Sequence, residues 1–295
     1  REFPEIRFHL EIHPALLTNE LKTALADMPT GCLHLEAGIQ SLHENVLMQS
    51  RRSGDLQHSL EGLRYLCSLT NMETHADLIA GLPLYKLEQI FEDIHVLAHF
   101  GAGEIQLESL KVLPGTEMRK RAEEWGIRYS PYPPYEVLET NEITAEELQY
   151  ARQLSRLLDG YYNTPIWQKI TCQLILSESG FLKSFLNFLI ASDVIDKPLS
   201  IEKRGLLLYD FCKQVYPEYT VHVSVAWIIA GLSLKKAPAE KVMTKHQNPP
   251  SVWNILQGKY KDSLKLCRLP HKTGNYWFGF EPETQIHVPV FIAEN

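Results

Sequence analysis

The first half of the chain alternates short apolar strands with helices, and this order constrains the fold more than any other feature of the sequence. Strands are predicted over 6–12, 32–39, 74–80 and 104–112. Helices are predicted over 19–28, 44–69, 87–100 and 117–125, with a break in the second near Ser53 and Gly54. Strands that alternate with helices form parallel β-α-β units with right-handed crossovers. The order therefore predicts an α/β fold on a parallel sheet.

Each of these strands is apolar on one face and polar on the other. In the second strand, for example, Leu33 and Leu35 alternate with His34 and Glu36. A parallel strand that is covered on both faces normally reads as a continuous apolar run. A sheet with one solvated face would explain the alternation. A curved sheet whose inner face lines a polar cleft explains it as well, and predicts a partial TIM-like (β/α) barrel of about four β-α units with its site at the C-terminal ends of the strands.

The second half is predicted to be mainly helical. A proline-rich connector covers 129–135, and a helix follows over 144–160, with Thr144 as N-cap and Glu147 completing a capping box. Further helices are predicted over 165–177, 180–192, 200–215 and 250–266, and a terminal β-hairpin over 276–280 and 285–292. We expect two domains, 1–160 and 161–295. The large apolar residues predicted to anchor the helical core are Trp167, Phe181, Phe185, Phe188, Trp227 and Trp253.

Composition and charge exclude several classes of protein. The net charge of -7 gives no electrostatic footprint for nucleic acid, and the apolar runs are too short to span a bilayer. The five cysteines lie far apart, at spacings that suit neither a disulfide framework nor a metal site, so we predict buried thiols in a reducing, cytoplasmic setting. The chain begins without Met and without a signal peptide, and we expect it to start partway through a longer protein.

Glycine and proline follow the strands where the chain must turn into the next helix. The runs are EAGIQS at 36–41, DLIAGLP at 77–83, LKVLPGT at 110–116 and PPYEVL at 133–138, with Arg51 between the first two. Each run alone is a weak signal, but the set in this order is specific. It resembles the radical S-adenosylmethionine (SAM) enzymes, in particular the class with a cobalamin-binding domain ahead of the barrel. The resemblance covers residues 6–145.

The resemblance implies a parent enzyme that binds SAM at a 4Fe–4S cluster and cleaves it reductively to a 5′-deoxyadenosyl radical. The family holds this cluster with a CxxxCxxC segment, which this sequence lacks. The strands present match the third to sixth of the family barrel, so the resemblance places the cluster segment, and any cobalamin domain, upstream of residue 1. It implies a small-molecule substrate and a reductant protein such as flavodoxin or ferredoxin. The oligomeric state is left open, and an oligomer is compatible with the resemblance.

Carried over by motif, the resemblance gives two groups of candidate residues. Arg51 matches the family arginine that contacts the SAM carboxylate, but the adjacent Arg52 could fill that place instead. The alternative is that Arg51 is only a surface charge on a helix. For Glu11 the alternative is a solvated carboxylate at an incomplete barrel edge. The candidates for SAM binding are Glu11, Glu36, Gln40, Arg51, Asp77, Leu113 and Pro114, and the substrate-side candidates are His9, His34, His75 and Glu108.

Several inward histidines also invite a metal site, for which His9 and His34 would be the first pair. No pattern of supporting residues is visible, and we predict no metal ligands in this chain. The aromatic connector Tyr129, Tyr132 and Tyr135 is predicted to cap the barrel edge, with a substrate gate as the alternative.

Two other functions remain open on the sequence. One is a hydrolase or lyase that uses Glu11, Glu36 and Asp77 for acid–base chemistry without iron or SAM. The other is a non-enzymatic assembly or regulatory domain that pairs with a partner through the sheet edge at 6–12.

Overall fold

The structure, a computed structural model, describes residues 6–52, 55–239, 267–271, 274–281 and 286–293. It divides into two compact units. Unit 1 contains residues 1–163 and 172–186, and unit 2 contains 164–171 and 187–295. The chain passes between the two units within helices α7 (Pro165–Ser177) and α8 (Phe181–Ala191).

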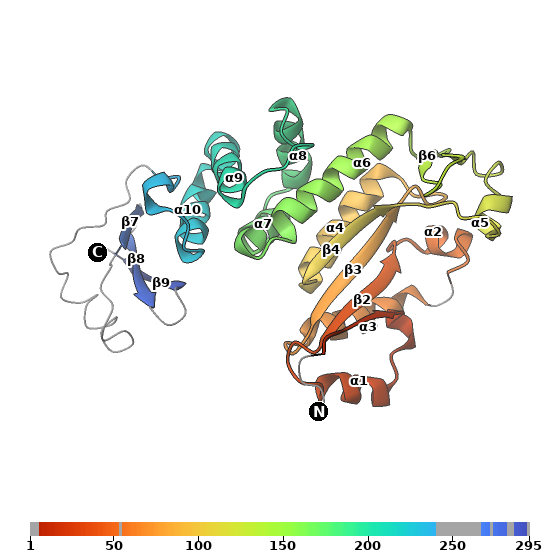
Figure 1. The fold of residues 1–295 in the computed structure, drawn as a ribbon, viewed down its shortest axis with the longest axis horizontal. Helices are drawn as coiled ribbons and strands as arrows, with labels where there is room; N and C mark the ends of the chain where they lie inside the picture. Colours follow the sequence, from red (N-terminus) through yellow and green to blue (C-terminus); the bar gives the residue numbers. More distant parts are fainter. Residues whose placement is uncertain (1–5, 53–54, 240–266, 272–273, 282–285, 294–295) are drawn as a thin grey trace. The chain divides into compact units, whose positions relative to one another are not determined.

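Unit 1 is built on a four-stranded parallel sheet in the order β1-β2-β3-β4 (Figure 1). The strands are β1 (Phe8–Ile12), β2 (Leu33–Gln40), β3 (Glu73–Ala80) and β4 (Glu104–Ser109). Helices α1 (Asn19–Ala26), α2 (Glu44–Gln49), α3 (Leu56–Ser68) and α4 (Leu87–Phe100) connect them, with a 3-10 turn over Pro14–Leu16. The α/β class, the parallel sheet and the break in the second helix are confirmed. Closure into a barrel stays a prediction.

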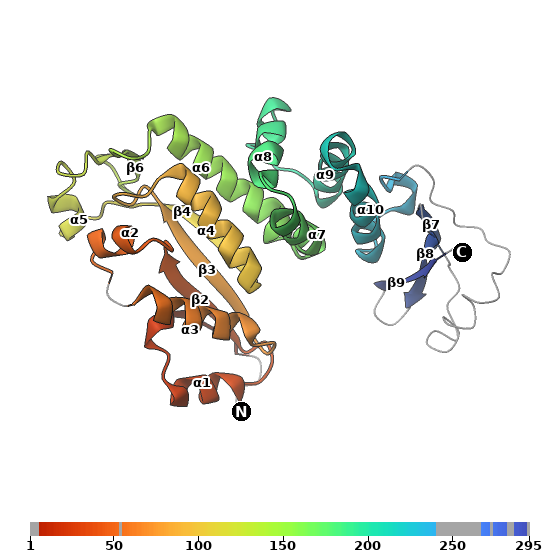
Figure 2. The ribbon, with the colours of Figure 1, turned by 180° about the vertical axis from the view of Figure 1, so that it is seen from behind.

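One face of the sheet packs against helices. Figure 2 shows α3 and α4 in front of it, and the β2 residues on this face, Leu33, Leu35, Ala37 and Ile39, are at most 5% exposed. The other face of β2 is half-buried along its length, as the sequence alternation predicts. Strand β3 differs, because His75 and Asp77 on its polar face are buried too, at 5% and 8% exposure.

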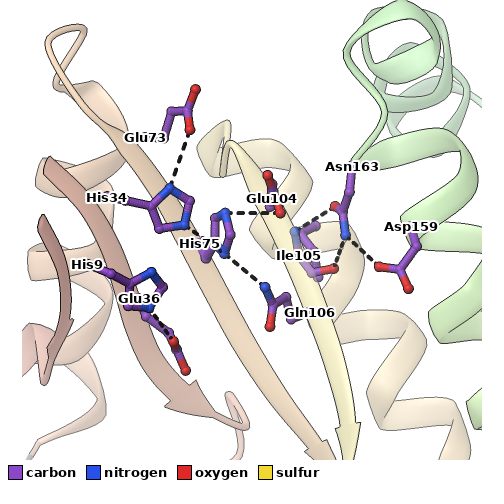
Figure 3. Close-up of polar contacts among 10 residues, drawn as sticks. All are labelled: His9, His34, Glu36, Glu73, His75, Glu104, Ile105, Gln106, Asp159 and Asn163. Atoms are coloured by element: carbon purple, nitrogen blue, oxygen red, sulfur yellow. Dashed lines mark hydrogen bonds and ion pairs between the residues drawn. The ribbon is translucent and has the colours of Figure 1, made fainter. Parts of the chain in front are cut away.

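The two edge strands of the sheet, β4 and β1, differ in whether their outer backbone groups are hydrogen-bonded. Along β4, the side chain of Asn163 accepts a hydrogen bond from the Ile105 amide (2.9 Å) and donates one to the Ile105 carbonyl (3.0 Å), as a neighbouring strand would (Figure 3). Further along, Val112 N donates to Tyr135 O and Val137 N to Leu110 O. No strand pairs with the outer edge of β1 in the part of the chain that the structure describes.

The rest of unit 1 follows β4. Helix α5 (Glu117–Lys120) leads into the short antiparallel strands β5 (Arg128–Tyr129) and β6 (Val137–Glu139), and α6 (Ala145–Leu157) continues into a π-helical turn over Leu158–Tyr162. The predicted capping box between Thr144 and Glu147 is present. Strand β4 is shorter than predicted because residues 110–112 pair with 135–137 in place of a continued parallel ladder.

Unit 2 contains α9 (Ile201–Val215), α10 (Thr220–Ile229), short 3-10 turns over Pro217–Tyr219 and Leu234–Lys236, and a three-stranded antiparallel sheet. Its strands are β7 (Cys267–His271), β8 (Gly274–Glu281) and β9 (Ile286–Ala293), of which β7 was not predicted. Helix α10 was not predicted either, because its β-branched sequence TVHVSVAWII has low helix propensity. Trp167, Phe181, Phe185 and Trp227 are buried, Phe188 is half-buried, and the helix predicted over 250–266 with Trp253 lies outside the described residues.

None of the helices in the described part of the chain has the length and apolar character needed to cross a membrane.

Candidate functional site

The polar face of the sheet in unit 1 carries ionisable groups at two levels. The first level lies near the strand starts and contains His9, His34 and His75, which we call the histidine row (Figure 3). The second lies toward the strand ends, where parallel sheets place their functional sites. We call it the strand-end cluster, and its members are Glu36, Gly38, Gln40, Arg52 and Asp77.

The three rings of the histidine row contact one another across β1, β2 and β3. The His9 and His34 rings stack with their centroids 4.8 Å apart, and the His75 ring meets His34 edge-on at 3.9 Å. His34 Nδ1 lies 3.3 Å from Glu73 Oε2, and His34 Nε2 lies 3.3 Å from His75 Nδ1. The row is therefore held by ring contacts and by hydrogen bonds between neighbouring strands.

His75 is the buried end of this row, and its neighbours fix its tautomer. The Gln106 amide nitrogen lies 2.9 Å from His75 Nδ1, so Nδ1 accepts and the ring proton sits on Nε2, which lies 3.0 Å from Glu104 Oε2. Burial lowers the pKa of His75, against the opposing attraction of Glu104. His75 is therefore neutral at neutral pH, with a structural set of partners.

Two carboxyl groups form the centre of the strand-end cluster. Glu36 Oε2 lies 2.8 Å from His9 Nε2, and this hydrogen bond is the main cause of the lowered pKa of Glu36. Burial raises the pKa of Asp77 to about 7, and its hydrogen bond to Glu36 and the negative charge of Glu36 add to the effect. Because two adjacent carboxylates resist ionising together, the pair retains a proton on Asp77 up to about neutral pH.

Arg52 reaches the same cluster from the loop after α2. Its guanidinium donates to the Gly38 carbonyl, and burial lowers the pKa of Arg52 while the charge of Asp77 raises it. A Cβ on Gly38 would lie 2.9 Å from Gln40 Nε2 and 3.1 Å from an Arg52 nitrogen. The glycine in EAGIQS thus makes room for both side chains.

Gln40 sits at an irregularity in the strand. Its φ is +72°, and the pairing of β2 with β3 shifts register between Gly38 and Gln40. Such a bulge re-aims a side chain at the end of a strand. The amide oxygen of Gln40 and Oδ1 of Asp77 are buried and have no hydrogen-bond partner among the described residues. Unsatisfied buried polar atoms at a strand end are what a ligand site leaves open.

Asp93 in α4 holds the turn that follows Gln40. It accepts hydrogen bonds from Tyr85 Oη (2.5 Å), Leu42 N (2.9 Å) and Ser41 Oγ (3.3 Å), and His43 Nε2 lies 3.2 Å from its other oxygen. Asp93 is 2% exposed, and burial raises its pKa against these donors. The sequence analysis missed it, although an aspartate between the core positions Ile90 and Ile94 was a signal in the printed sequence.

The other SAM-binding candidates lie outside this cluster. Arg51 is exposed and pairs with Glu117 at 3.8 Å, so it is Arg52 that the structure brings to Asp77. Leu113 and Pro114 lie in the exposed loop before α5. Glu11 and Glu108 are also exposed, and their negative charges contribute to the raised pKa of Asp77. His13 caps the 3-10 turn after β1, where Nδ1 accepts from Ala15 N.

The aromatic connector packs beside α5. The Arg119 guanidinium lies 5.1 Å from the Tyr129 ring centroid and 4.9 Å from that of Tyr135, while Tyr132 is 75% exposed. Gly81, at φ +88°, lies against β6, because a Cβ there would be 2.6 Å from Val137 Cγ1. The connector itself is joined to the segment after β4 by the hydrogen bond from Val112 N to Tyr135 O.

The environments of Cys67, Cys172 and Cys212 do not suit ligands of an iron–sulfur cluster. Burial raises the pKa of Cys67 to about 11 and that of Cys212 to about 12, and it raises that of Cys172 as well. Cluster ligands must be thiolates, which such environments disfavour. Across the described residues there is no group of three or more His, Cys, Asp or Glu side chains that could hold a metal ion.

Comparison with protein families gives one match, to a family described as "Protein of unknown function (DUF4080)", over residues 123–225. No curated protein matches the sequence. The matched stretch begins after the strand-end cluster and covers about a third of the chain, so it identifies no function for the polar face.

Comparison with solved structures finds radical SAM enzymes. The radical SAM methyltransferase TsrM of Kitasatospora setae, solved with a tryptophan substrate and a SAM analogue, is 16% identical over 50% of this chain and 30% of its own, with a TM-score of 0.36. It has also been solved with cobalamin and a 4Fe–4S cluster. Coproporphyrinogen III oxidase (HemN) of Escherichia coli, a radical SAM enzyme, is 12% identical over 70% of this chain and 69% of its own, with a TM-score of 0.33.

The archaeal Elp3 of Methanocaldococcus infernus is 13% identical over 96% of this chain and 55% of its own, with a TM-score of 0.39. The chain thus spans 30% of the length of TsrM and 55% of that of Elp3. All these TM-scores are below 0.5, so the likeness to these structures gives no role to the residues of this chain.

Proposed function

We propose that this chain supplies part of the SAM- and substrate-binding wall of a radical SAM enzyme whose other segments provide the cluster. The proposal rests on the strand-end motifs in their order and on where their side chains lie. In this proposal the parent uses SAM, a 4Fe–4S cluster and a reductant such as flavodoxin or ferredoxin in the cytoplasm, with cobalamin as a further candidate. Burial disfavours the thiolate forms of Cys67, Cys172 and Cys212, so in this proposal the ligands of the cluster come from other segments of the parent.

The observation that carries the proposal is Arg52 beside the unsatisfied oxygens of Gln40 and Asp77. Arg52 uses one nitrogen on the Gly38 carbonyl, and its planar fork leaves other N–H groups for a carboxylate such as the one that SAM carries. Protonated Asp77 can donate and Gln40 Oε1 can accept. The cluster thus offers a cation from the loop after α2, a donor on β3 and an acceptor at the end of β2, which suits a zwitterionic ligand with hydroxyl groups.

The carboxylates around this cluster add acceptors for ligand hydroxyls. Glu36 is half-buried, while Glu11 and Glu108 are exposed. Ligand groups that hydrogen-bond to them would exchange water for a carboxylate, a charge-assisted bond. We propose Glu11, Glu36, Gln40, Arg52 and Asp77 as the contacts of this wall. Arg51 stays the alternative arginine, and Leu113 with Pro114 an apolar rim.

The test is a titration of the 295-residue chain with SAM to millimolar concentration, in which binding is monitored by amide chemical shifts in NMR spectra. We expect shifts at residues 36–40, 52 and 77, and a loss of affinity of about tenfold or more in Arg52→Ala, because a charge-assisted pair is removed. Arg51→Ala is the matched control and should bind as the wild type does. Equal losses in both variants, or no shifts in the strand-end cluster, would contradict the proposed role of Arg52.

Anaerobic reconstitution with iron and sulfide tests whether this chain can hold an iron–sulfur cluster without the rest of the parent protein. Because burial disfavours the thiolate form of three cysteines, we expect no stable cluster on this chain. A 4Fe–4S signal in electron paramagnetic resonance that changes on adding SAM would contradict that expectation.

Acid–base catalysis without iron or SAM is a second candidate, favoured by the pKa of Asp77 near neutrality beside ionised Glu36. It predicts hydrolase or lyase turnover by the metal-free chain, lost in Asp77→Asn. Turnover that requires iron and SAM would exclude it.

Pairing through the β1 edge is a third candidate. Phe8 and Leu10 on this edge strand are 50% and 45% exposed, and an open edge with apolar side chains is suited to strand addition. It predicts a concentration-dependent mass in size-exclusion chromatography with light scattering. A monomer at all concentrations would exclude self-association.

A further inference from the structure

The Asp77 carboxyl is a buried acid whose second oxygen has no protein partner. The residue is 8% exposed, and Oδ1 is without a hydrogen bond among the described residues. Leaving such an oxygen unsatisfied costs free energy, about 1–3 kcal/mol for a typical buried group. A carboxyl kept at that cost on the polar face of β3 is suited to contact with a ligand.

A chain of polar groups leads from this carboxyl toward solvent. Asp77 on β3 pairs in register with Gly38 on β2, which places Glu36, two residues earlier on the same face, diagonally across from it, and the Glu36 charge raises the pKa of Asp77. Glu36 Oε2 lies 2.8 Å from His9 Nε2, and the His9 side chain is 54% exposed. Figure 3 shows the His9–Glu36 contact at the β1–β2 side of the face. His34 and His75 form a separate branch, which ends at Glu73, Gln106 and Glu104.

We propose that Asp77 exchanges a proton with the bound substrate and that Glu36 and His9 connect Asp77 to solvent. The inference rests on the proposed function for the presence of a substrate over the strand-end cluster. It adds the substrate class, which is a molecule that gains or loses a proton at the atom facing Asp77. The connection to solvent is a property of the free chain.

The step balances as a proton transfer. Protonated Asp77 gives its proton to a basic atom of the substrate and becomes a carboxylate. Glu36 then passes to Asp77 a proton that it takes from Nε2 of the His9 ring, and the ring takes a proton from hydronium or a buffer acid in solvent, so that all three groups return to their starting states. In the reverse direction Asp77 takes the proton that the substrate releases. No electrons move in either direction.

The charges that face Asp77 come from four places. Glu11 on β1, Glu36 on β2 and Glu108 on β4 favour its protonated form. Arg52 from the loop after α2 opposes them. His75 and His9 act on Glu36, where they favour the ionised form. The effects that raise the pKa of Asp77 outweigh the effect of Arg52, because burial acts in the same direction as the three carboxylates.

The test is a carbon-13 NMR titration of Asp and Glu side-chain carboxyls in the 295-residue chain without SAM. Asp77→Asn assigns the signal. We expect Asp77 to titrate near pH 7 and Glu36→Gln to lower that midpoint by about one unit or more, since a neighbouring negative charge is lost. An Asp77 midpoint near 4, or one that Glu36→Gln leaves unchanged, would overturn the proposal.

The connection to solvent is tested by time-resolved infrared spectroscopy of the protonated Asp77 carbonyl after a pH jump. We expect His9→Gln to slow deprotonation about tenfold or more, and His34→Gln, the matched control from the same row, to leave the rate unchanged. Equal rates in wild type and His9→Gln would overturn the path. Methyl NMR spectra check that each variant is folded. Since no SAM is present, failure here is separate from failure of SAM binding.

Discussion

The two levels of the polar face use similar residues in opposite ways. In the histidine row, Glu73 lies 3.3 Å from His34 Nδ1 and the Gln106 amide hydrogen-bonds to His75 Nδ1, while His75 Nε2 lies 3.0 Å from Glu104 without hydrogen-bond geometry. In the strand-end cluster, Asp77 and Gln40 retain buried oxygens without partners. Buried polar groups stabilise a fold when they are satisfied and cost free energy when they are not. The difference is the basis of our proposal that the row supports the sheet and that the cluster binds a ligand.

We expect the largest change in the free energy of unfolding when Asp93, which holds the turn after Gln40, is replaced. Asp93→Ala leaves Tyr85, Ser41 and the Leu42 amide without their acceptor, so we expect a loss of about 4 kcal/mol in the free energy of unfolding, measured by urea denaturation. Glu92→Ala, at the exposed neighbouring position, should change it by less than about 0.5 kcal/mol. Similar small effects in both variants would show that the turn after Gln40 does not depend on Asp93.

The second effect has the opposite sign. The pKa of Asp77 is raised in the folded chain to about 7, so the unfolded chain releases its proton first as pH rises, and stability falls between about pH 4 and pH 7. Asp77→Asn removes this loss. We expect it to stabilise the chain by about 3 kcal/mol at pH 8 and by almost nothing at pH 4, measured by urea denaturation at both values. A stabilisation independent of pH would contradict the titration argument.

The third effect is on the histidine row. His75→Ala removes a 5% exposed ring and leaves Gln106 and Glu104 without their partner, so we expect a loss of about 2 kcal/mol in thermal or urea unfolding at pH 7. His58→Ala, an exposed histidine on α3, is the control and should have little effect. If His75→Ala were neutral or stabilising, the row would resemble the strand-end cluster and the contrast between the levels would fail.

The smallest effect is at the middle of the row. His34→Gln loses a ring stack with His9 and a 3.3 Å contact to the exposed Glu73, so we expect a change of about 0.5 kcal/mol. The measurement is the same urea denaturation, repeated at high salt, where the Glu73 contribution should shrink. If His34→Gln lost as much stability as His75→Ala, the whole row would stabilise the sheet, and not mainly His75 at its buried end.

Much of unit 1 could be predicted from local sequence. The helix over Leu87–Phe100, the capping box of α6 and the four parallel strands follow from periodicity and from Thr144 with Glu147, because these signals act over a few residues. Helix α10 and strand β7 could not be predicted in this way. Their stability comes from packing in unit 2, which outweighs local propensity.

The sequence by itself determined which residues face the polar side of the sheet, because strand alternation has a period of two and a glycine or proline marks each turn. It named Glu36, Gln40 and Asp77 from their motifs. Only the tertiary structure decided between Arg51 and Arg52, separated the histidine row from the strand-end cluster and brought Asp93 to the turn after Gln40. These outcomes depend on strand register, on a bulge and on contacts up to 52 residues apart in the chain, which no local pattern encodes.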